Sequence, residues 1–364
     1  MGLKKIHIQG FKSIRDQELE FGPLNVFIGG NGVGKSNLVG VFHFLNQVSR
    51  QSLQTYTGVV GGANALLHFG RKNTKKLTLE TEFQAGAKDV NIYKFSLIPT
   101  DEDRFVFENE LTFYWNKVQY PASPYNDEVW QGHTEAHVRE SNRRVAKHIQ
   151  NHLDSYRIYH FHDTSSSATV KQTGDVNDNR IFRPDAGNLA AFLYMLQQAR
   201  PGYFENIEDT IRQAAPFFGR FTLEPLALNP DKIRLEWQEK DSDTTFGPSA
   251  LSDGTLRFMC LATLLLQPSL PSLILIDEPE LGLHPAAIQI LAGLLQSVAT
   301  RTQLIVATQS VTLINQLLPE HVWVVDREDG QSVFKNLKSA DMTSWLEDYS
   351  LGELWEKNII GGRP

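Results

Sequence analysis

The chain has 364 residues, 41% of them apolar, which is enough for one large core or for two lobes that share an interface. A formal net charge of −7 does not favour nucleic acid as a partner of the whole surface, although a local basic face is not excluded. The single cysteine, Cys260, excludes a disulfide framework and a cysteine-based zinc site, and it suits a reducing cytoplasm.

The first forty residues predict a strand, a turn, a second strand, a loop and a helix. Ile6–Ile8 begins the first strand, and the β-branched and aromatic run Leu24–Ile28 has the length of a buried strand. A glycine-dense loop follows, after which residues 37–48 have helical apolar spacing. From residue 76 to residue 98 the apolar positions alternate, which indicates further strands.

The middle of the chain is expected to be mostly helical. Residues 126–155 are polar and basic and contain a candidate helix over residues 135–153. A stronger helix is predicted over residues 188–198, with Pro201 as its stop, and another over residues 203–215. This stretch therefore predicts a helical lobe inserted into an α/β core.

The last third of the chain returns to alternating strands and helices. The predicted helices cover residues 251–266 and 285–299, and the predicted strands cover residues 273–276, 303–307 and 321–326. Short apolar strands between helices favour a parallel sheet that is covered on both faces. The longest apolar run, Phe258–Leu266, is far shorter than the roughly 20 residues of a membrane span. We therefore expect a soluble, cytoplasmic protein with no membrane partner.

The predicted division of the chain is a split core with one inserted lobe. Residues 1–125 and 220–364 form the α/β core, and residues 126–219 form the mostly helical lobe. About 214 residues separate the glycine-rich loop from the helix at residue 251, and they contain no heptad array, so no coiled-coil arm is expected. About 54 residues follow Ser310, too few for an appended catalytic domain of ordinary size.

The glycine-rich loop is a full match to the phosphate-binding pattern G-x-x-x-x-G-K-[ST]. It lies between a predicted strand and a predicted helix, which is the context that the pattern requires. The glycines let backbone N–H groups turn toward phosphate oxygens, and the helix N-terminus adds positive potential. Lys35 is expected to neutralise the β- and γ-phosphates of ATP, and Ser36 to ligate Mg²⁺. The residues predicted to bind the nucleotide here are Gly29, Gly30, Asn31, Gly32, Val33, Gly34, Lys35, Ser36 and Asn37.

Two carboxylates follow the apolar strand of residues 273–276. Asp277 is expected to lie beside the phosphate-binding loop and to hold Mg²⁺ through water. Glu278 is then placed to polarise the attacking water as a general base. Acid pairs at strand ends are common by themselves, but together with the phosphate-binding loop this pair predicts ATP hydrolysis.

Three further segments surround this strand in a fixed order: Leu251–Thr255 opens a helix, Glu280–Pro285 follows the carboxylates, and Thr308–Ser310 ends the next strand. With the phosphate-binding loop (the P-loop), this order resembles the ABC-type ATPases, in particular their RecF/SMC-like branch. A closer resemblance, nearly over the full length, is to the bacterial RecF-like predicted ATPases. It is carried by Tyr159–Ser165, Gly187–Leu193, Tyr349–Trp355 and Gly361–Pro364.

The resemblance implies an ABC/RecF-type P-loop ATPase head, an α/β fold with a mixed sheet core and an inserted, mostly helical lobe. It also implies a homodimer, formed on ATP binding, in which two heads sandwich two ATP molecules. Ser252 and Gly254 of one copy would then face the γ-phosphate held by the other, with a hydroxyl, a backbone N–H and a helix N-terminus. The residues alone favour an ordinary helix cap at Ser252 or Asp253.

Two departures from the family pattern bear on the rate and the role. Gln309 stands where many ABC proteins have histidine, and its amide can hydrogen-bond a γ-phosphate or water but cannot carry a proton. The residues expected to act in catalysis are Glu278, Lys35 and Gln309. Because Gln309 replaces histidine, we expect slow hydrolysis, so that the protein acts as a timer and not as a fast motor. The run Leu251–Thr255 differs from the Leu-Ser-Gly-Gly-Gln of transporters, which weakens a transporter interpretation.

Six of the eleven histidines fall between His133 and His162. His148 and His152 have the i,i+4 spacing of a helical metal pair, although a solvated helix face explains them as well. In ABC heads a glutamine at this junction senses Mg²⁺ and the γ-phosphate. By position, either His162 or Asp163 would replace it, unless the segment is a structural polar turn.

Three weaker signals concern partners. Basic residues between Arg139 and Lys147 have helical spacing and form either a contact for nucleic-acid phosphates or a solvated face. The Lys12–Ser13 turn resembles the first-strand turn that meets the nucleotide in RecF-like heads. The aromatic tail over residues 345–355 is either packed on the core or a docking surface.

Three functions stay open at this point. The first is a DNA-associated ATPase in repair or in genome and anti-phage defence. The second is a slow regulatory switch that controls a separately encoded nuclease or other effector without binding DNA itself. The third, ranked last, is the nucleotide-binding subunit of a transporter.

Overall fold

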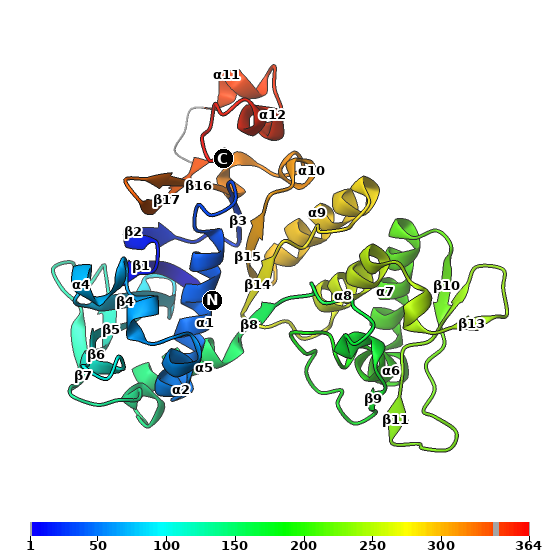
Figure 1. The fold of residues 1–364 in the computed structure, drawn as a ribbon, viewed down its shortest axis with the longest axis horizontal. Coiled ribbons are helices and arrows are strands. Elements are labelled where there is room, and N and C mark those ends of the chain that lie inside the picture. Colours follow the sequence, from blue (N-terminus) through cyan, green and yellow to red (C-terminus); the bar gives the residue numbers. More distant parts are fainter. Residues whose placement is uncertain (1, 338–341, 364) are drawn as a thin grey trace.

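A six-stranded mixed sheet lies between two lobes of the molecule (Figure 1). The computed structural model describes residues 2–337 and 342–363. The strands of this central sheet are β3 (Leu24–Ile28), β8 (Tyr156–Tyr159), β14 (Leu273–Asp277), β15 (Gln303–Thr308), β16 (Val322–Glu328) and β17 (Gln331–Asn336). Their order is β17-β16-β3-β15-β14-β8, and all neighbours are parallel except the hairpin of β16 and β17.

Both faces of this sheet are buried, because alternate residues of its strands enter two different cores. Val26 and Ile276 pack into the core of the lobe that contains the later helices. Phe27 and Leu275 point to the opposite face and pack against the N-terminal lobe. Near-continuous apolar strands such as these are typical of a parallel sheet covered by helices on both sides.

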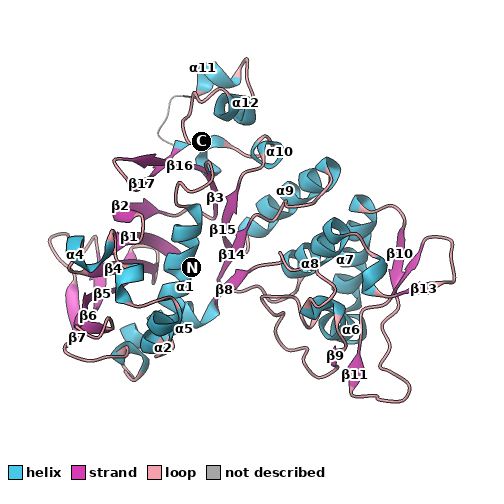
Figure 2. Ribbon diagram, in the orientation of Figure 1, coloured by secondary structure: helices cyan, strands magenta, loops and turns pink. Residues whose placement is uncertain are grey.

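The N-terminal lobe places helices between the central sheet and a second, antiparallel sheet (Figure 2). The second sheet has the order β2-β1-β4-β5-β6-β7. Its strands are β1 (Leu3–Phe11), β2 (Ile14–Glu20), β4 (Leu77–Gln84), β5 (Asp89–Pro99), β6 (Phe105–Asn116) and β7 (Tyr125–Trp130). The helices of this lobe are α1 (Lys35–Ser49), α2 (Leu53–Val59), α3 (Ala63–Leu66), α4 (Gly70–Asn73) and α5 (Arg144–Ser155).

The second lobe packs helices on the other face of the central sheet (Figure 1). Its helices are α6 (Leu189–Ala199), α7 (Pro201–Ala214), α8 (Asp253–Leu266) and α9 (Pro285–Ala299). Short strands lie at its outer end: β9 (Gly174–Asp175), β10 (Phe218–Phe221), β11 (Lys232–Ile233), β12 (Trp237–Glu239) and β13 (Thr245–Phe246). The short helix α10 (Val311–Ile314) follows β15, and the short helices α11 (Thr343–Leu346) and α12 (Leu351–Glu356) follow β17.

The architecture confirms the predicted α/β class with a mixed sheet core, but several elements differ from their predicted bounds. The helix expected over residues 135–153 is α5, which spans Arg144–Ser155 and follows a short 3-10 turn at His137–Arg139. Pro201 does not only stop one helix. It also begins α7, because proline is well suited to the first turn of a helix, where its missing N–H has no partner to lose.

The strand β8 lies within the residues 126–219 that were expected to form the lobe, yet it pairs in parallel with β14 in the central sheet. The chain enters the second lobe only after Tyr159 and returns to the sheet at Leu273. We therefore propose that the inserted lobe begins after residue 159 and includes α8. Among the described residues, no helix combines the length and apolar character of a membrane span.

Candidate functional site

The P-loop connects the end of β3 to the start of α1, as the sequence predicts. Gly32 and Gly34 adopt positive φ values of 76° and 120°, which side chains with a Cβ rarely adopt. A Cβ atom on Gly34 would also lie 2.0 Å from the hydroxyl oxygen of Ser332. The loop therefore needs glycine at residue 34 for both its backbone conformation and its close packing.

Lys35 is the first residue of α1 and is only 7% exposed. Its Nζ donates hydrogen bonds to the carbonyl oxygens of Gly29 at 2.6 Å and Gly30 at 2.9 Å. Burial lowers the pKa of Lys35, while Glu278 and Asp277 act in the opposite direction. The ammonium group is thus held inside the loop, on the side where the two carboxylates lie.

The carboxylates stand where β14 ends, beside β15. Burial, and then the neighbouring charge of Glu278, raises the pKa of Asp277 above its ordinary value. Glu278 itself has a positive φ of 43°, and its N–H donates to the carbonyl oxygen of Ala307 on β15 at 2.8 Å. Gln309 Nε2 donates to Glu278 Oε1 at 2.6 Å. The Gln309 side chain therefore orients the Glu278 carboxylate, which is expected to act as the general base.

Glu280 is a third acidic residue at this edge, and sequence reasoning gave it no role. Its Oε1 accepts hydrogen bonds from the hydroxyl of Thr308 at 2.5 Å and from the N–H of Gln309 at 3.2 Å. Its Oε2 is buried and has no hydrogen-bond partner among the described residues. Burial raises the pKa of Glu280. Glu280 thus fixes the backbone that carries Gln309, and the sequence signal was its place two residues after Glu278.

These side chains line one cavity of about 190 Å³. Its lining residues are Gly30, Asn31, Gly32, Gly34, Lys35, Ser36, Asn37, Asp277, Glu278 and Gln309. The cavity lies at the carboxyl ends of β3, β14 and β15, where α/β sheets usually bind ligands. The cavity offers backbone N–H groups and one ammonium group to an anion, and carboxylate and hydroxyl oxygens to a hard cation such as Mg²⁺.

The P-loop is supported by residues from distant parts of the chain. The buried hydroxyl of Ser332, on β17, donates to the carbonyl of Val33 at 2.6 Å and lies 2.6 Å from the hydroxyl of Ser13. Asn37 Nδ2 donates to that same Ser13 oxygen at 2.6 Å. The expected Lys12–Ser13 turn is therefore joined to the P-loop, and Ser332 is a supporting residue that the sequence did not reveal.

A second support comes from the last described residues. The N–H of Gly30, in the P-loop, donates to the carbonyl of Gly362 at 2.8 Å, and the N–H of Gly362 donates to Asp326 at 3.2 Å. The aromatic tail is partly packed: Trp355 is 8% exposed, whereas Trp345 is 44% exposed. Trp355 therefore packs on the core, whereas Trp345 lies at the surface.

Ser252 and Gly254 lie at the start of α8, in the second lobe (Figure 1). Ser252 caps the helix, because its Oγ accepts a hydrogen bond from the N–H of Thr255 at 3.2 Å. Both residues line a different cavity of about 130 Å³, which shares no lining residue with the P-loop cavity. A Cβ on Gly254 would lie 2.1 Å from the carbonyl oxygen of Gly282, so the helix tip packs closely on the turn after the carboxylates.

Arg257, one turn further along α8, links three segments of the site. Its guanidinium donates to the carbonyl oxygens of Phe161 at 2.8 Å and His162 at 3.2 Å, and also to that of Leu281. Of the two residues expected to replace the family's glutamine, His162 lies nearer the end of β14, because its Nε2 donates to the carbonyl of Asp277 at 3.1 Å. The Asp163 carboxylate instead accepts hydrogen bonds from Ser165.

The other weak signals do not join the site. Two of the basic residues have acidic partners nearby, since Arg139 pairs with Asp154 at 2.6 Å and Arg143 lies 3.5 Å from Asp127. The rings of His148 and His152 lie 4.7 Å apart, and burial lowers the pKa of His152 to about 4. No third metal-ligating side chain joins this pair among the described residues.

The chain is similar to known proteins in sequence and in fold. Residues 24–315 match the family AAA_21, described as "AAA domain, putative AbiEii toxin, Type IV TA system". The chain is 25% identical over 177 residues to a "DNA replication and repair protein RecF" of Desulfitobacterium hafniense, with 47% of this chain and 46% of the relative covered. The protein with the same description from Phocaeicola vulgatus is 47% identical over 47 residues, which is 13% of each chain. The chain thus spans less than half the length of these curated relatives.

Solved structures of SMC heads share the fold. A head described as bound to the C-winged helix domain of ScpA has a TM-score of 0.60 at 16% identity, covering 93% of this chain and 99% of that one. An SMC head with an extended coiled coil, bound to the C-terminal domain of ScpA derived from Pyrococcus furiosus, has a TM-score of 0.56 at 16% identity, covering 95% and 99%. At these identities the likeness concerns the fold alone.

Proposed function

Because the chain belongs to the AAA_21 family of ABC/SMC-type P-loop ATPases, we propose that it binds ATP with Mg²⁺ and hydrolyses it as a homodimer. The observation that carries this proposal is the single cavity in which Lys35, Ser36, Asp277, Glu278 and Gln309 meet. Phosphate oxygens would accept hydrogen bonds from the backbone N–H groups and from the Lys35 ammonium. The Ser36 hydroxyl would coordinate Mg²⁺ directly, and Asp277 would hold it through water.

The cavity supplies the groups for hydrolysis in named roles. Glu278 would orient and deprotonate the attacking water, and the hydrogen bond from Gln309 would set the direction of its carboxylate. Lys35 would neutralise charge on the transferring phosphoryl group. Because burial and like charge already disfavour the ionised carboxylate of Asp277, a divalent cation at this edge would relieve the repulsion.

Two observations support a shared site. The α8 tip at Ser252 and Gly254 opens into a cavity of its own, outside the cavity of the P-loop. In ABC-type heads this helix tip completes the nucleotide site of the opposite copy, and the resemblance carries that role to these residues. Ser252 is exposed, so its hydroxyl and the N-terminus of a 14-residue helix are available to a phosphate of a second copy.

The biological setting we propose is DNA repair or genome defence in the cytoplasm. The curated relatives are named for DNA replication and repair, and the family description names a toxin–antitoxin system. The ion pairs of Arg139 and Arg143 do not favour direct DNA binding through that basic segment. DNA would instead contact a surface that forms when two copies close on ATP.

One observation favours the alternative of a slow regulatory switch acting on a separately encoded effector. Gln309 Nε2 donates a hydrogen bond to Glu278 Oε1 at 2.6 Å, and its amide cannot accept and release a proton as histidine does. Hydrolysis would then be slow, and the closed, ATP-bound state would last long enough to control a partner.

The direct test is titration of the protein with Mg-ATP, followed by steady-state turnover with and without duplex DNA at several salt concentrations. The proposal expects saturable binding in the wild type and its loss in Lys35→Ala, with Lys72→Ala, at an exposed lysine of α4, as the matched control. Turnover that rises with DNA and falls with salt supports the DNA-associated function. Turnover indifferent to DNA supports the switch, and absence of Mg-ATP binding overturns both.

A further inference from the structure

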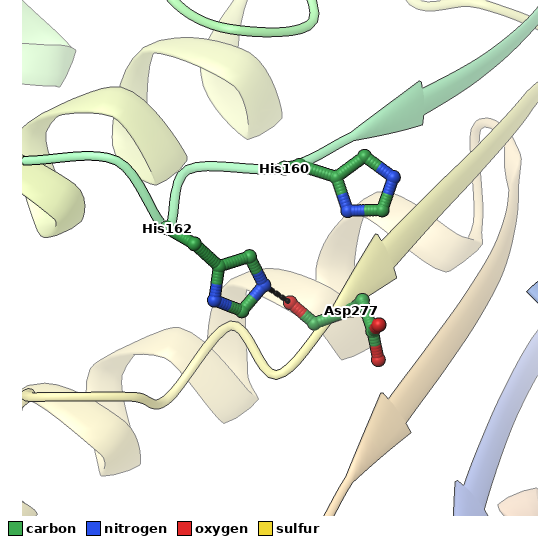
Figure 3. Close-up of side chains that lie close together, drawn as sticks. All are labelled: His160, His162 and Asp277. Carbon is green, nitrogen blue, oxygen red and sulfur yellow. Dashed lines mark hydrogen bonds between the residues drawn. The ribbon is translucent and has the colours of Figure 1, made fainter. Parts of the chain in front are cut away.

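Two histidines lie close to Asp277, which lines the P-loop cavity (Figure 3). His160 and His162 follow β8, and Asp277 ends β14. One ligand atom from each of the three side chains lies within 4.8 Å of the others. Among the described residues, this is the one group of three metal-ligating side chains that approach so closely.

The strand pairing explains why these residues come together. β8 and β14 are parallel, and Tyr159 pairs with Ile276, so the residues that follow each strand emerge side by side. In extended backbone, residues two apart point to the same side. Phe161 enters the core, at 7% exposure, and the two histidines on either side of it are directed toward the end of β14 (Figure 3).

Neighbouring groups hold the histidines in this position. The ring of His160 stacks on that of His43, from α1, with centroids 5.9 Å apart and an interplanar angle of 5°. The backbone on either side of the turn is fixed by Arg257, which donates to the carbonyls of Phe161 and His162. His162 Nε2 donates to the carbonyl of Asp277. Such supporting contacts around imidazoles are what orient ligands at metal sites.

The charges at this edge also favour a cation. Asp277 and Glu278 place two carboxylates side by side, and Lys35, the nearby ammonium, is turned into the P-loop. A neutral imidazole offers a metal ion the free lone pair that it requires, and the ligand atom of His160 lies within 4.8 Å of those of His162 and Asp277. The three donors are therefore two imidazole nitrogens and one carboxylate oxygen.

We propose that His160, His162 and Asp277 bind one divalent first-row transition-metal ion at the edge of the P-loop cavity. Two imidazoles and one carboxylate suit zinc, cobalt, manganese or ferrous ions, whereas Mg²⁺ prefers oxygen ligands. With metal–ligand distances of about 2.0–2.2 Å, ligand atoms lie at most about 4.4 Å apart, so a small closing movement from the 4.8 Å envelope suffices. His162 Nε2 would exchange its hydrogen bond to the Asp277 carbonyl for the ion.

The inference goes beyond the proposed function and shares one residue, Asp277, with it. A metal ion bound here would connect the segment after β8, which enters the second lobe, to the end of β14 beside the proposed nucleotide site. It would bind the nucleotide-free protein, which separates it from the Mg²⁺ that arrives with ATP. The affinity of each metal ion for imidazole nitrogen would therefore decide which ion binds, and binding would not require ATP.

The test is titration of nucleotide-free protein with Co²⁺, followed by its visible absorption, with Zn²⁺ and Mg²⁺ as competitors. One Co²⁺ per chain is expected, displaced by Zn²⁺ and not by an equal concentration of Mg²⁺. His160→Ala should weaken Co²⁺ binding at least about tenfold. His160→Gln provides a second variant that keeps the size of the side chain, and thermal unfolding verifies that both are folded. His148→Ala, from the helical histidine pair, is the matched control and should bind Co²⁺ as the wild type does.

Lys35→Ala separates this inference from the proposed function, because it should lose Mg-ATP binding and keep Co²⁺ binding. If wild-type protein binds Co²⁺ but never Mg-ATP, the proposed function fails and the metal site stands. If the folded His160 variants bind Co²⁺ like the wild type, or if His148→Ala removes the binding instead, the metal site is refuted. Equal displacement of Co²⁺ by Mg²⁺ refutes its preference for transition metals.

Discussion

Replacing Glu278 with glutamine should separate ATP binding from ATP hydrolysis. In the structure, Gln309 Nε2 donates to Glu278 Oε1 at 2.6 Å. The glutamine variant keeps a side-chain oxygen that accepts this bond, so the geometry of the cavity should be retained. What it loses is the carboxylate that takes a proton from the attacking water.

The size of the effect follows from the role of Glu278. A positioned general base contributes about 10²- to 10⁴-fold to a rate, or about 2.7–5.5 kcal/mol of barrier. Turnover by Glu278→Gln should fall by this factor. Binding of Mg-ATP should be unchanged or tighter, because the negative charge that disfavours the ionised form of Asp277 has been removed.

The assay is single-turnover hydrolysis of labelled ATP, combined with an equilibrium titration of Mg-ATP. Glu239→Gln, at the exposed last residue of β12, makes the same chemical change away from the cavity and should behave as the wild type. Turnover by Glu278→Gln within about threefold of the wild type would refute the assignment of Glu278 as the base. Loss of Mg-ATP binding in this variant would show instead that the carboxylate holds the metal.

Three further outcomes are expected. Ser332→Val removes the buried hydroxyl bonded to Val33 and should lower the free energy of unfolding by about 1–3 kcal/mol, measured in denaturant; a stability equal to the wild type would contradict the support role. Because the pKa values of Asp277 and Glu280 are raised in the folded state, folding binds protons, and stability falls as the pH rises through the range between unfolded and folded pKa. Asp277→Asn should therefore raise the unfolding temperature of the nucleotide-free protein at neutral pH, with a gain that shrinks as the pH falls toward about 4; no gain at neutral pH would contradict this account. Gln309→His should raise steady-state turnover about tenfold, and turnover at or below that of the wild type would show that Gln309 does not limit the rate.

The local parts of the site could be predicted from sequence because each is a continuous segment. The strand, glycine turn and helix around Gly29–Ser36 have a pattern with one structural solution, and the apolar strand before Asp277 directs the carboxylates to the same edge of the sheet. The helices α8 and α9 were predicted within two residues of their bounds, because their apolar spacing and their caps agree.

The remainder depends on tertiary contacts that periodicity does not encode. Ser332 and Gly362 reach the P-loop from more than 290 residues away in the chain. The strand Tyr156–Tyr159 has only four residues and follows a polar helix, so its place in the central sheet comes from pairing with β14. The meeting of His160 and His162 with Asp277 depends on that same pairing. Without it, the sequence suggests a role only for His162, by its position, and none for His160.

A mixing experiment tests the shared site most directly. Glu278→Gln protein keeps a competent α8 tip but cannot activate water, whereas Ser252→Arg protein keeps a competent P-loop but presents a defective tip. Each alone should be nearly inactive. Mixed in equal amounts with Mg-ATP, they should form heterodimers in which one of the two sites is intact, and turnover should recover to roughly a quarter of the wild-type value. A mixture no more active than the two separate proteins would contradict a site built from two copies.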